Sequence, residues 1–433
     1  MTLLAAPPVP SRSRPAAAPS PTAVPGTTGP LDVLGVPGQI NFDYAASAPC
    51  LRAAADAVTD LLPWYASVHR GAGALSAHCT LAYERARQTI GDFFGARTDD
   101  HVIVTRNTTD ALNLLARALP TGITVVTFAG EHHANLLPWP AGTVRLPAPD
   151  SPAAAVRALD AALRELRRGP DGGVQDGPVL VAVTGASNVT GECWPIARLA
   201  RQAHRHGARI VVDAAQLAPH VPVDLAALDV DYLAVSGHKL YAPFGAGVLI
   251  GRADWLDAAP PYLAGGGATG HVGDATHDVR WATGPARHEA GTPNLLGAVA
   301  LAAVCTALVE ADRPALHARE QALLARLRTG LAALPDVVEL HTFGVDADRV
   351  GIVSFVVAGR DSAEIAAELA REHQIGVRDG LFCAHPLTRR LLAEAAARTG
   401  RQDLPPTALR VSLGLGSTAA QVDRLLGALA TIG

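Results

Sequence analysis

Short apolar runs alternate with helical patterns along the chain from about residue 100 onwards. The runs consist mainly of Val, Ile, Leu and Ala, and several segments between them place apolar residues at the spacing of a helix. This alternation is typical of a mostly parallel sheet that is covered by helices on both faces. The expected strands are 101–105, 123–128, 179–184, 208–212, 232–235 and 247–250, and the expected helices among them are 109–119 and 195–206.

Clusters of polar residues follow five of these strands. In a parallel sheet, ligand-binding residues gather just past the carboxyl ends of the strands, so we expect the five clusters to converge on one site. The clusters are Asn107–Asp110, Glu131–Asn135, Ser187–Asn188, Asp213–Gln216 and Ser236–Lys239.

The pattern changes past about residue 300. Two helices are expected over 297–311 and 314–334, followed by strands at 351–357 and 409–413. At the other end, residues 1–30 contain eight prolines among Ala and Ser, and such a segment buries too little apolar surface to fold. We therefore expect four regions. They are a disordered tail over 1–30, a segment over 31–60 that packs with the small domain, a large domain over 61–296 and a small α+β domain over 297–433.

Composition excludes several classes of partner. The 433 residues carry a net charge of −4, and acidic and arginine residues are interspersed without a basic stripe, which argues against a nucleic-acid ligand. No apolar stretch approaches the ~20 residues of a membrane span. The five cysteines are scattered and odd in number, which indicates a reducing compartment, so we expect a cytoplasmic protein. Adjacent histidines such as His132 and His133 point apart, and we assign no metal.

Lys239 is the only lysine among 36 Lys and Arg residues. Arginine replaces lysine wherever a positive charge is sufficient, but a guanidinium cannot act as an amine nucleophile or form an imine. Lys239 is therefore a candidate for covalent chemistry. The alternative is that Lys239 is a lysine that remains by chance on a solvated surface. The residues upstream decide between these two interpretations.

Those upstream residues match the needs of pyridoxal 5′-phosphate. This cofactor requires a lysine imine and an acid next to its ring nitrogen, which keeps the ring an electron sink. Asp213 ends an apolar strand and suits the acid, although it could instead cap the next helix. Thr108 and Thr109 open a helix, where backbone N–H groups and the helix dipole favour a phosphate, although an ordinary N-cap has the same pattern. Ser236 and His238 flank the lysine and could complete the phosphate site.

Residues 38–433 resemble the class V, fold type I pyridoxal-phosphate enzymes, and within them the group of cysteine desulfurases and selenocysteine lyases. The resemblance rests on five motifs that occur in the family's order. They are Arg106-Asn107-Thr108-Thr109-Asp110, Glu131 to Trp139 (EHHANLLPW), Asp213-Ala214-Ala215-Gln216, Ser236-Gly237-His238-Lys239-Leu240-Tyr241 and Glu289 to Asn294 (EAGTPN). The resemblance implies a large domain with a mostly parallel seven-stranded sheet and a smaller α+β domain.

The same resemblance implies a role for each motif residue. Lys239 binds the cofactor as an imine and then moves the α-proton of the substrate, and His132 stacks on the pyridine ring. Asp213 pairs with the ring nitrogen, and Gln216 contacts the phenolic oxygen. The phosphate is held by Thr109, Ser236 and His238, next to Thr108.

Three further positions concern the substrate and the partner subunit. Thr292 matches a phosphate contact that comes from the other subunit, so the resemblance implies a homodimer with shared sites. Asn188 and Arg410 match positions that hold the substrate carboxylate, for which a bidentate guanidinium is suited.

Cys383 decides the reaction that the resemblance implies. It matches the desulfurase cysteine, whose thiolate attacks the sulfur of the substrate and carries the persulfide. The alternative for a lone cysteine is a small buried hydrophobic residue. The family usually has histidine or other polar residues directly before this cysteine, where this chain has Leu381 and Phe382, and Gly73 replaces a second histidine.

The sequence thus predicts an enzyme that removes sulfur from L-cysteine, or selenium from selenocysteine, and leaves alanine and a persulfide on Cys383. A small amino-acid substrate and a sulfur-acceptor protein are the implied partners. One alternative is another class V reaction in secondary metabolism, namely an aminotransferase, a C–S β-lyase or an epimerase, in which Cys383 is not catalytic. Another is a non-enzymatic scaffold, which the filled cofactor positions argue against.

Overall fold

The computed structural model describes residues 22–23, 29–168, 177–275 and 277–432. The disordered tail expected over residues 1–30 falls almost entirely outside the described residues.

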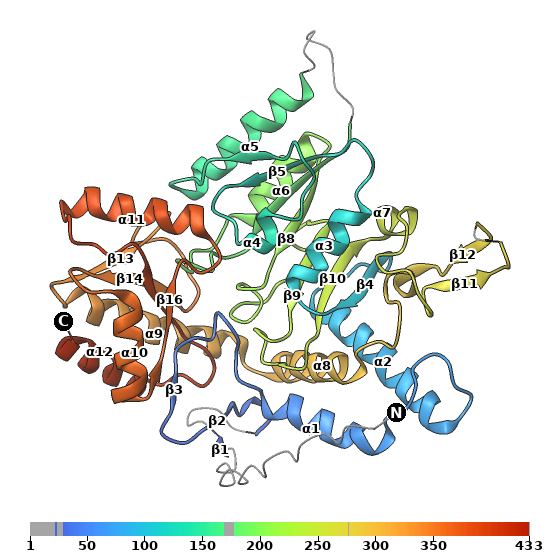
Figure 1. Ribbon diagram of the computed structural model, residues 1–433, viewed down its shortest axis with the longest axis horizontal. Helices are drawn as coiled ribbons and strands as arrows, with labels where there is room; N and C mark the ends of the chain where they lie inside the picture. Colours follow the sequence, from blue (N-terminus) through green and yellow to red (C-terminus); the bar gives the residue numbers. More distant parts are fainter. Residues whose placement is uncertain (1–21, 24–28, 169–176, 276, 433) are drawn as a thin grey trace, which may run out of the picture.

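The central element is a seven-stranded sheet with the strand order β4-β10-β9-β8-β7-β5-β6 (Figure 1). The neighbours from β9 to β6 pair in parallel, and β10 runs antiparallel to both β9 and β4. This confirms the mostly parallel seven-stranded sheet. The strands are β4 (Asp100–Thr105), β5 (Thr124–Phe128), β6 (Val144–Leu146), β7 (Val179–Thr184), β8 (Arg209–Asp213), β9 (Tyr232–Ser236) and β10 (Gly247–Arg252).

Both faces of this sheet are buried, because successive residues of a strand point to opposite faces. Val181 and Ile210 pack in one apolar cluster, while their neighbours Leu180 and Val211 pack in another on the opposite face. The first cluster includes side chains of α1 (Arg52–Leu61), α2 (Ala74–Phe93), α5 (Pro152–Arg167), α6 (Ile196–Arg205) and α8 (Leu295–Glu310). The second includes α3 (Thr108–Ala118), α4 (His133–Leu136) and α7 (Ala253–Ala258).

A second, four-stranded antiparallel sheet with the order β13-β14-β17-β16 forms the other half of the molecule. One of its faces packs against α9, α10 and α12, and the other packs against α11. The strands are β13 (Val337–Leu340), β14 (Ile352–Val357), β16 (Arg378–Gly380) and β17 (Ala408–Ser412). The helices are α9 (Arg313–Ala332), α10 (Ser362–His373), α11 (His385–Thr399) and α12 (Ala419–Ile432).

The segment expected to pack with the small domain contacts both halves. Its strand β3 (Ile40–Asn41) pairs with β15 (Ile375–Gly376), whereas its helix α1 packs against α8. The apolar side chains of α8 lie in the cluster of the seven-stranded sheet, although the sequence pattern alone grouped this helix with the residues that follow it. The expected domain limits therefore stay predictions.

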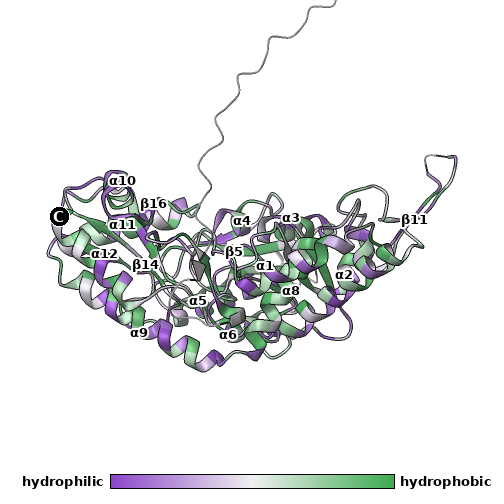
Figure 2. Ribbon diagram, turned by 90° about the horizontal axis from the view of Figure 1, so that it is seen from below, coloured by the Kyte–Doolittle hydropathy of each residue, from purple (hydrophilic) through white to green (hydrophobic). Residues whose placement is uncertain are grey.

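A hairpin formed by β11 (Thr269–Val272) and β12 (Val279–Trp281) projects from the body of the molecule in two perpendicular views (Figures 1 and 2). The short elements that remain are β1 (Thr22–Ala23), β2 (Leu34–Gly35) and the 3-10 helices Gly29–Leu31, Leu62–Trp64 and Gly284–His288. Within the described ranges, no single helix has both the length and the apolar composition needed to cross a membrane.

Candidate active site

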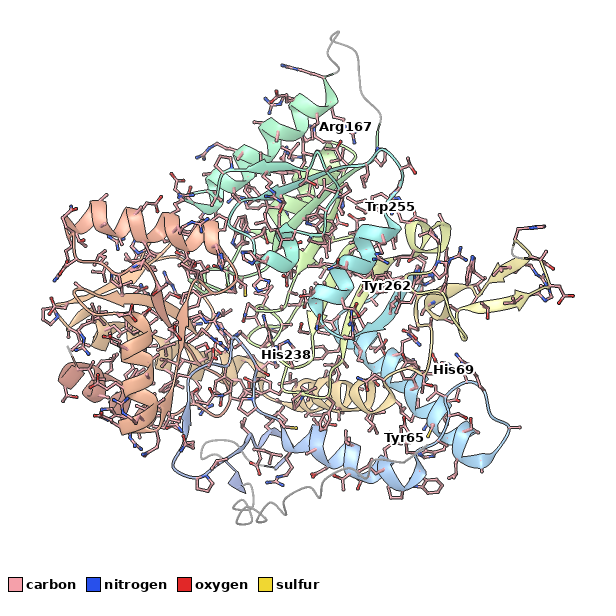
Figure 3. The ribbon with its side chains drawn as sticks, viewed as in Figure 1. Tyr65, His69, Arg167, His238, Trp255 and Tyr262 are labelled. Atoms are coloured by element: carbon pink, nitrogen blue, oxygen red, sulfur yellow. The ribbon has the colours of Figure 1, made fainter. Side chains whose placement is uncertain are left out.

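A cavity of about 510 Å³ lies where the two halves of the molecule meet. It is lined by residues that follow β4, β5, β7, β8 and β9, as the positions of the polar clusters predict, and by residues around β16 and β17. His238 is labelled near the centre of the molecule in Figure 3. The cavity collects every predicted site residue except Thr292, namely Thr108, Thr109, His132, Asn188, Asp213, Gln216, Ser236, His238, Lys239, Cys383 and Arg410.

The N-terminus of α3 is fixed at one end of this cavity. Asn107 caps the helix by accepting the N–H of Asp110 at 3.0 Å. The N–H of Thr108 donates to Ser236 Oγ at 2.8 Å, and that hydroxyl donates to Thr108 Oγ1 at 2.8 Å. A Cβ at Gly247 would lie 2.7 Å from Asn107 Cα. The start of β10 can therefore pack against this loop only because residue 247 has no side chain. The helix end, whose free N–H groups favour anions, is thereby joined to the end of β9.

Lys239 and Asp213 both line the cavity. Burial lowers the pKa of the Lys239 amine to about 8, against the opposing pull of the Asp213 carboxylate. Burial raises the pKa of Asp213, whose Oδ1 accepts the N–H of Ala215 at 3.0 Å. Oδ2 accepts no hydrogen bond from the described residues. The pair therefore provides an amine that is partly neutral near pH 8 and an acid with one oxygen free.

His132 caps α4, with its Nδ1 accepting the N–H of Ala134 at 3.0 Å. Burial, followed by the charge of Lys239, lowers the pKa of His132 to about 3. The ring is therefore neutral near pH 7, and Nε2 carries its proton. Across the cavity, Gln216 Nε2 donates to the carbonyl of Ala45 at 2.7 Å, which fixes the orientation of its amide.

Glu131 is a fully buried acid beside these residues, and sequence reasoning gave it no role. Its Oε1 accepts the N–H of Thr184 at 3.0 Å, and its Oε2 accepts Nδ2 of Asn135 at 2.8 Å. Burial raises the pKa of Glu131 to about 8, so the side chain is protonated at neutral pH. In the sequence, Glu131 begins a polar cluster after an apolar strand and opens the motif EHHANLLPW, but neither feature gave it a role.

Two arginines of the cavity lining, Arg378 and Arg410, are joined through Asp43. Arg410 is buried and donates through Nη1 to the carbonyl of Asn188 at 2.9 Å and through Nη2 to Asp43 Oδ1 at 3.1 Å. The other oxygen of Asp43 pairs with Arg378 at 2.7 Å. Arg410 Nε is a buried donor with no acceptor among the described residues. Asp43 and Arg378 were missed from the sequence because hundreds of residues separate Asp43 from its partners.

Cys383 lies in a strained turn with its thiol exposed to the cavity. Phe382 and Cys383 both have a φ of 52°, a left-handed conformation that non-glycine residues rarely adopt. Asn188 Nδ2 donates to the carbonyl of Phe382 at 2.7 Å, and the N–H of His133 donates to the carbonyl of Cys383 at 2.8 Å. The Phe382 ring is buried, with the Arg410 guanidinium 5.2 Å from its centroid. These contacts hold Cys383 at the cavity, so it is not a small buried hydrophobic residue.

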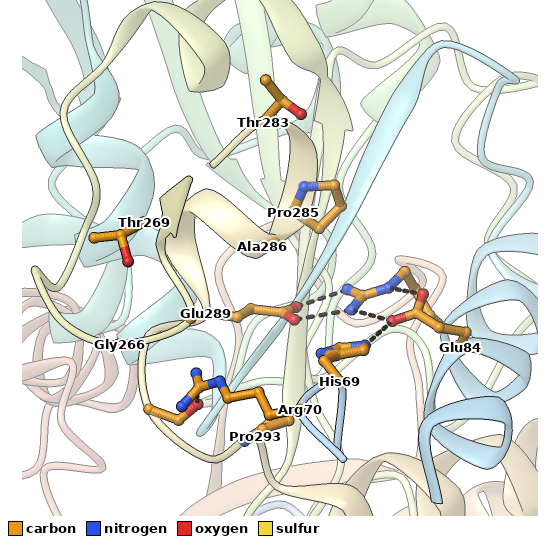
Figure 4. Close-up of a pocket in the computed structure, with 13 residues that line it drawn as sticks. His69, Arg70, Glu84, Gly266, Thr269, Thr283, Pro285, Ala286, Glu289 and Pro293 are labelled. Carbon is orange, nitrogen blue, oxygen red and sulfur yellow. Dashed lines mark hydrogen bonds and ion pairs between the residues drawn. The ribbon is translucent and has the colours of Figure 1, made fainter. Parts of the chain in front are cut away.

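Thr292 is the predicted residue that this chain does not bring to the cavity; it lies near Tyr262 and Asn294 instead. Its neighbours Gly291 and Pro293 line a second cavity of about 720 Å³ (Figure 4). There the guanidinium of Arg87 bridges Glu84 and Glu289, with 2.7 Å from Nη1 to Glu289 Oε1. The expectation that Thr292 serves a second subunit stays a prediction. Within the part of the chain that the structure describes, no group of three or more His, Cys, Asp or Glu side chains is placed to hold a metal.

Known proteins are similar to this chain over most of its length. The sequence profile of the family "Aminotransferase class-V" matches residues 40–425. A cysteine desulfurase of Dickeya dadantii is 36% identical over 401 residues, which is 90% of this chain and 90% of that protein. A cysteine desulfurase of Klebsiella pneumoniae is 34% identical over 382 residues, which is 85% of this chain and 86% of that protein.

Two solved structures share the fold. The apo cysteine desulfurase of Thermococcus onnurineus superposes with a TM-score of 0.77 at 30% identity, over 91% of this chain and 94% of that one. The cysteine desulfurase CsdA of Escherichia coli, solved with an S-sulfonic acid, has a TM-score of 0.75 at 30% identity, over 91% of this chain and 94% of that one. The similarity therefore extends over both sheets and the cavity that lies between them.

Proposed function

Since this chain belongs to the class-V aminotransferase family and has the type I fold of its pyridoxal-phosphate enzymes, we propose that it removes the sulfur of L-cysteine with that cofactor. The products are alanine and a persulfide on Cys383, and selenocysteine is the corresponding selenium substrate. The observation that carries the proposal is that Cys383 presents its thiol to the same cavity as Lys239 and Asp213.

The residues of the cavity fit pyridoxal 5′-phosphate. Lys239 offers the amine that the cofactor aldehyde requires, and the free Oδ2 of Asp213 suits the ring nitrogen. The neutral ring of His132 suits stacking on the pyridine, and Gln216, which lines the same cavity, suits the phenolic oxygen. The phosphate would bind at the N-terminus of α3, with Thr108, Thr109, Ser236 and His238. When bound there, the cofactor supplies an electron sink.

Arg410 and Asn188 suit the carboxylate of an amino acid. The Arg410 guanidinium is buried beside the Phe382 ring, and its Nε–H lacks an acceptor among the described residues. A substrate carboxylate would supply such an acceptor, and charged pairs of this kind are stronger than neutral hydrogen bonds. Asp43 holds the guanidinium in place through Nη2.

Cys383 receives the sulfur. Its thiolate forms a new S–S bond with the sulfur of the substrate, while the C–S bond of the substrate breaks and the carbon takes up a proton. L-cysteine and the Cys383 thiol thereby become alanine and the Cys383 persulfide, and the exchange balances without an external oxidant. The amine of Lys239, when it is free and neutral, would serve as the base for the α-proton of the substrate.

We also propose that the enzyme works as a homodimer in a reducing, cytoplasmic compartment. Thr292 is exposed and outside its own chain's cavity, which suits a contact to a second subunit's phosphate site. All five cysteines are free, which suits a reducing environment. The persulfide then requires an acceptor protein with its own thiol.

Turnover of L-cysteine tests the proposal, with alanine and sulfide measured together in the presence of a reducing thiol. We expect the wild-type enzyme to form both, and Cys383→Ala to lose both while it keeps the visible absorbance of the bound cofactor. Cys50→Ala is the matched control, because Cys50 is a free cysteine outside this cavity.

Three outcomes would contradict the proposal. Alanine formation by Cys383→Ala would remove that residue from sulfur transfer. Sulfide with pyruvate would indicate a β-lyase, and a keto acid without sulfide would indicate an aminotransferase.

A further inference from the structure

Three imidazoles surround the turn that carries Cys383. His132 and His385 line the cavity together with the thiol, and His133 packs its ring against that of His385 with 4.6 Å between centroids. His133 makes two hydrogen bonds to this turn. Its backbone N–H donates to the carbonyl of Cys383 at 2.8 Å, and its Nε2 accepts the backbone N–H of His385 at 3.5 Å.

Two of these imidazole rings already accept a hydrogen bond. Nδ1 of His132 accepts the N–H of Ala134, and Nε2 of His133 accepts the N–H of His385. Burial lowers the pKa of both rings, with the further influence of Lys239 on His132 and of His385 on His133. One nitrogen of each of these two rings is therefore already occupied by a backbone N–H.

His385 differs from the other two rings. It is exposed at the first position of α11, two residues after Cys383, and its ring nitrogens have no hydrogen-bond partner in the described part of the chain. Imidazole is the side chain that ordinarily takes up and releases a proton between pH 5 and 8. The residues directly before the cysteine, Leu381 and Phe382, cannot exchange a proton.

Two basic side chains share the cavity with the thiol. Cys383 interacts electrostatically with Lys239 and with Arg410, and each of these cations lies in the same cavity. The left-handed turn at Phe382 and Cys383 fixes the direction of the thiol through the hydrogen bonds of Asn188 and His133. The titratable and charged groups that line the cavity with His385 are His132, Asp213, His238, Lys239, Arg378, Asp379, Cys383 and Arg410, and His133 packs against the ring of His385.

From this arrangement we propose that His385 is the proton acceptor for Cys383. This inference rests on the proposed function and identifies a residue that prepares the nucleophile. The S–H bond of Cys383 breaks, the proton moves to a ring nitrogen of His385, and the electron pair stays on sulfur. That pair then forms the S–S bond with the sulfur of the substrate. The imidazolium afterwards supplies the proton that the carbon takes up when its C–S bond breaks, so His385 ends each turnover unchanged.

Alkylation of Cys383 by iodoacetamide tests the step without relying on turnover. The holoenzyme is treated between pH 5.5 and 9.5, and the Cys383 peptide is quantified by mass spectrometry against the peptides of the other four cysteines. We expect His385→Gln to move the alkylation profile of Cys383 to higher pH, with the rate falling about tenfold for each pH unit of that displacement. His373→Gln is the matched control, because His373 lies at the end of α10, outside the cavity.

Turnover supplies a second readout. We expect kcat/KM with L-cysteine to fall about a hundredfold in His385→Ala, and added imidazole to restore part of it. A purely structural role for His385 would give neither rescue nor a displaced alkylation profile.

The outcomes separate this inference from the function it rests on. An unchanged alkylation profile in both His385 variants, with normal cofactor absorbance, would overturn the role of His385 even if Cys383→Ala is inactive. If Cys383→Ala still forms alanine, the proposed function fails, whereas a displaced profile would still support proton exchange between His385 and the thiol. Should His385→Gln lose the cofactor absorbance, the imidazole rescue of His385→Ala decides, and its absence would overturn the inference.

Discussion

Asn188 donates a hydrogen bond from its side-chain amide to the backbone carbonyl of Phe382, with 2.7 Å between the two atoms. Asn188 follows β7 in the seven-stranded sheet, whereas Phe382 belongs to the turn before α11. The carbonyl of Asn188 also accepts from Arg410. One residue therefore joins the sheet that supports the proposed cofactor site to both the proposed carboxylate ligand and the proposed nucleophile.

Removing this amide is expected to loosen the turn. In Asn188→Ala the buried carbonyl of Phe382 loses its donor, at a cost of roughly 1–3 kcal/mol. We expect a lower midpoint of urea unfolding and slower alanine formation. Asn113→Ala is the control, because its amide donates only to Thr109 of its own helix. An unchanged rate of alanine formation would show that the turn keeps its conformation without Asn188.

Replacing Lys239 tests the covalent role of the lone lysine. Lys239→Arg keeps a positive charge in the cavity but cannot bond to an aldehyde, and Lys239→Ala removes the charge as well. We expect both variants to lose turnover and the visible absorbance band of the bound cofactor. Measurable turnover by either variant would contradict the assignment of Lys239.

Cofactor loading is expected to depend on pH through the same amine. Only the neutral amine attacks an aldehyde, and burial lowers the pKa of Lys239 to about 8. The loading rate of the apoenzyme with pyridoxal 5′-phosphate should rise about tenfold for each pH unit below 8 and level off above it. Stopped-flow absorbance measures this rate. A rise that continues to pH 10 would show that the amine keeps its ordinary pKa.

Glu131 is expected to make stability depend on pH. Its pKa is raised from an ordinary value of 4.5 to about 8, so the unfolded chain releases the proton first as the pH rises. The contribution of Glu131 is therefore complete below pH 4.5. It declines by up to about 1.4 kcal/mol for each pH unit towards pH 8.

Glu131→Gln should flatten that part of the profile. Asn135 Oδ1 is buried and has no hydrogen-bond partner among the described residues, and a rotated Asn135 amide would offer this oxygen to the N–H₂ group of a glutamine. Urea unfolding of both proteins at pH 5, 6.5 and 8 measures the effect. Parallel profiles for the two proteins would mean that Glu131 is ionised in the folded state.

The sequence pattern allowed six strands of the large sheet and the place of its site to be predicted because two simple regularities coincide there, whereas the count of seven strands came from the family resemblance. Strands buried on both faces are continuous apolar runs, as in β7 and β9, and the polar residues at their ends must meet at one edge. Short strands with mixed patterns, such as β6 and β16, carry no such signal.

Contacts between distant segments could not be predicted. Asp43 pairs with Arg410, which lies 367 positions away in the sequence. The residues around neither of them indicate this contact. The left-handed turn at Phe382 and Cys383 is set by hydrogen bonds from Asn188 and His133, since neither residue of the turn favours that conformation by itself. Helix α8 was grouped with the smaller half because its apolar character does not reveal which core it enters.

Lys239 lies directly after β9, which pairs with β10 in the interior of the seven-stranded sheet. Because it is the only lysine, a protease specific for lysine has a single cleavage site within these 433 residues, and it yields the fragments 1–239 and 240–433. The protease must bind the backbone around Lys239 in an extended conformation, which requires this part of the sheet to open. Cleavage by such a protease would therefore report the opening of the cofactor site itself, with one cut for each molecule that unfolds.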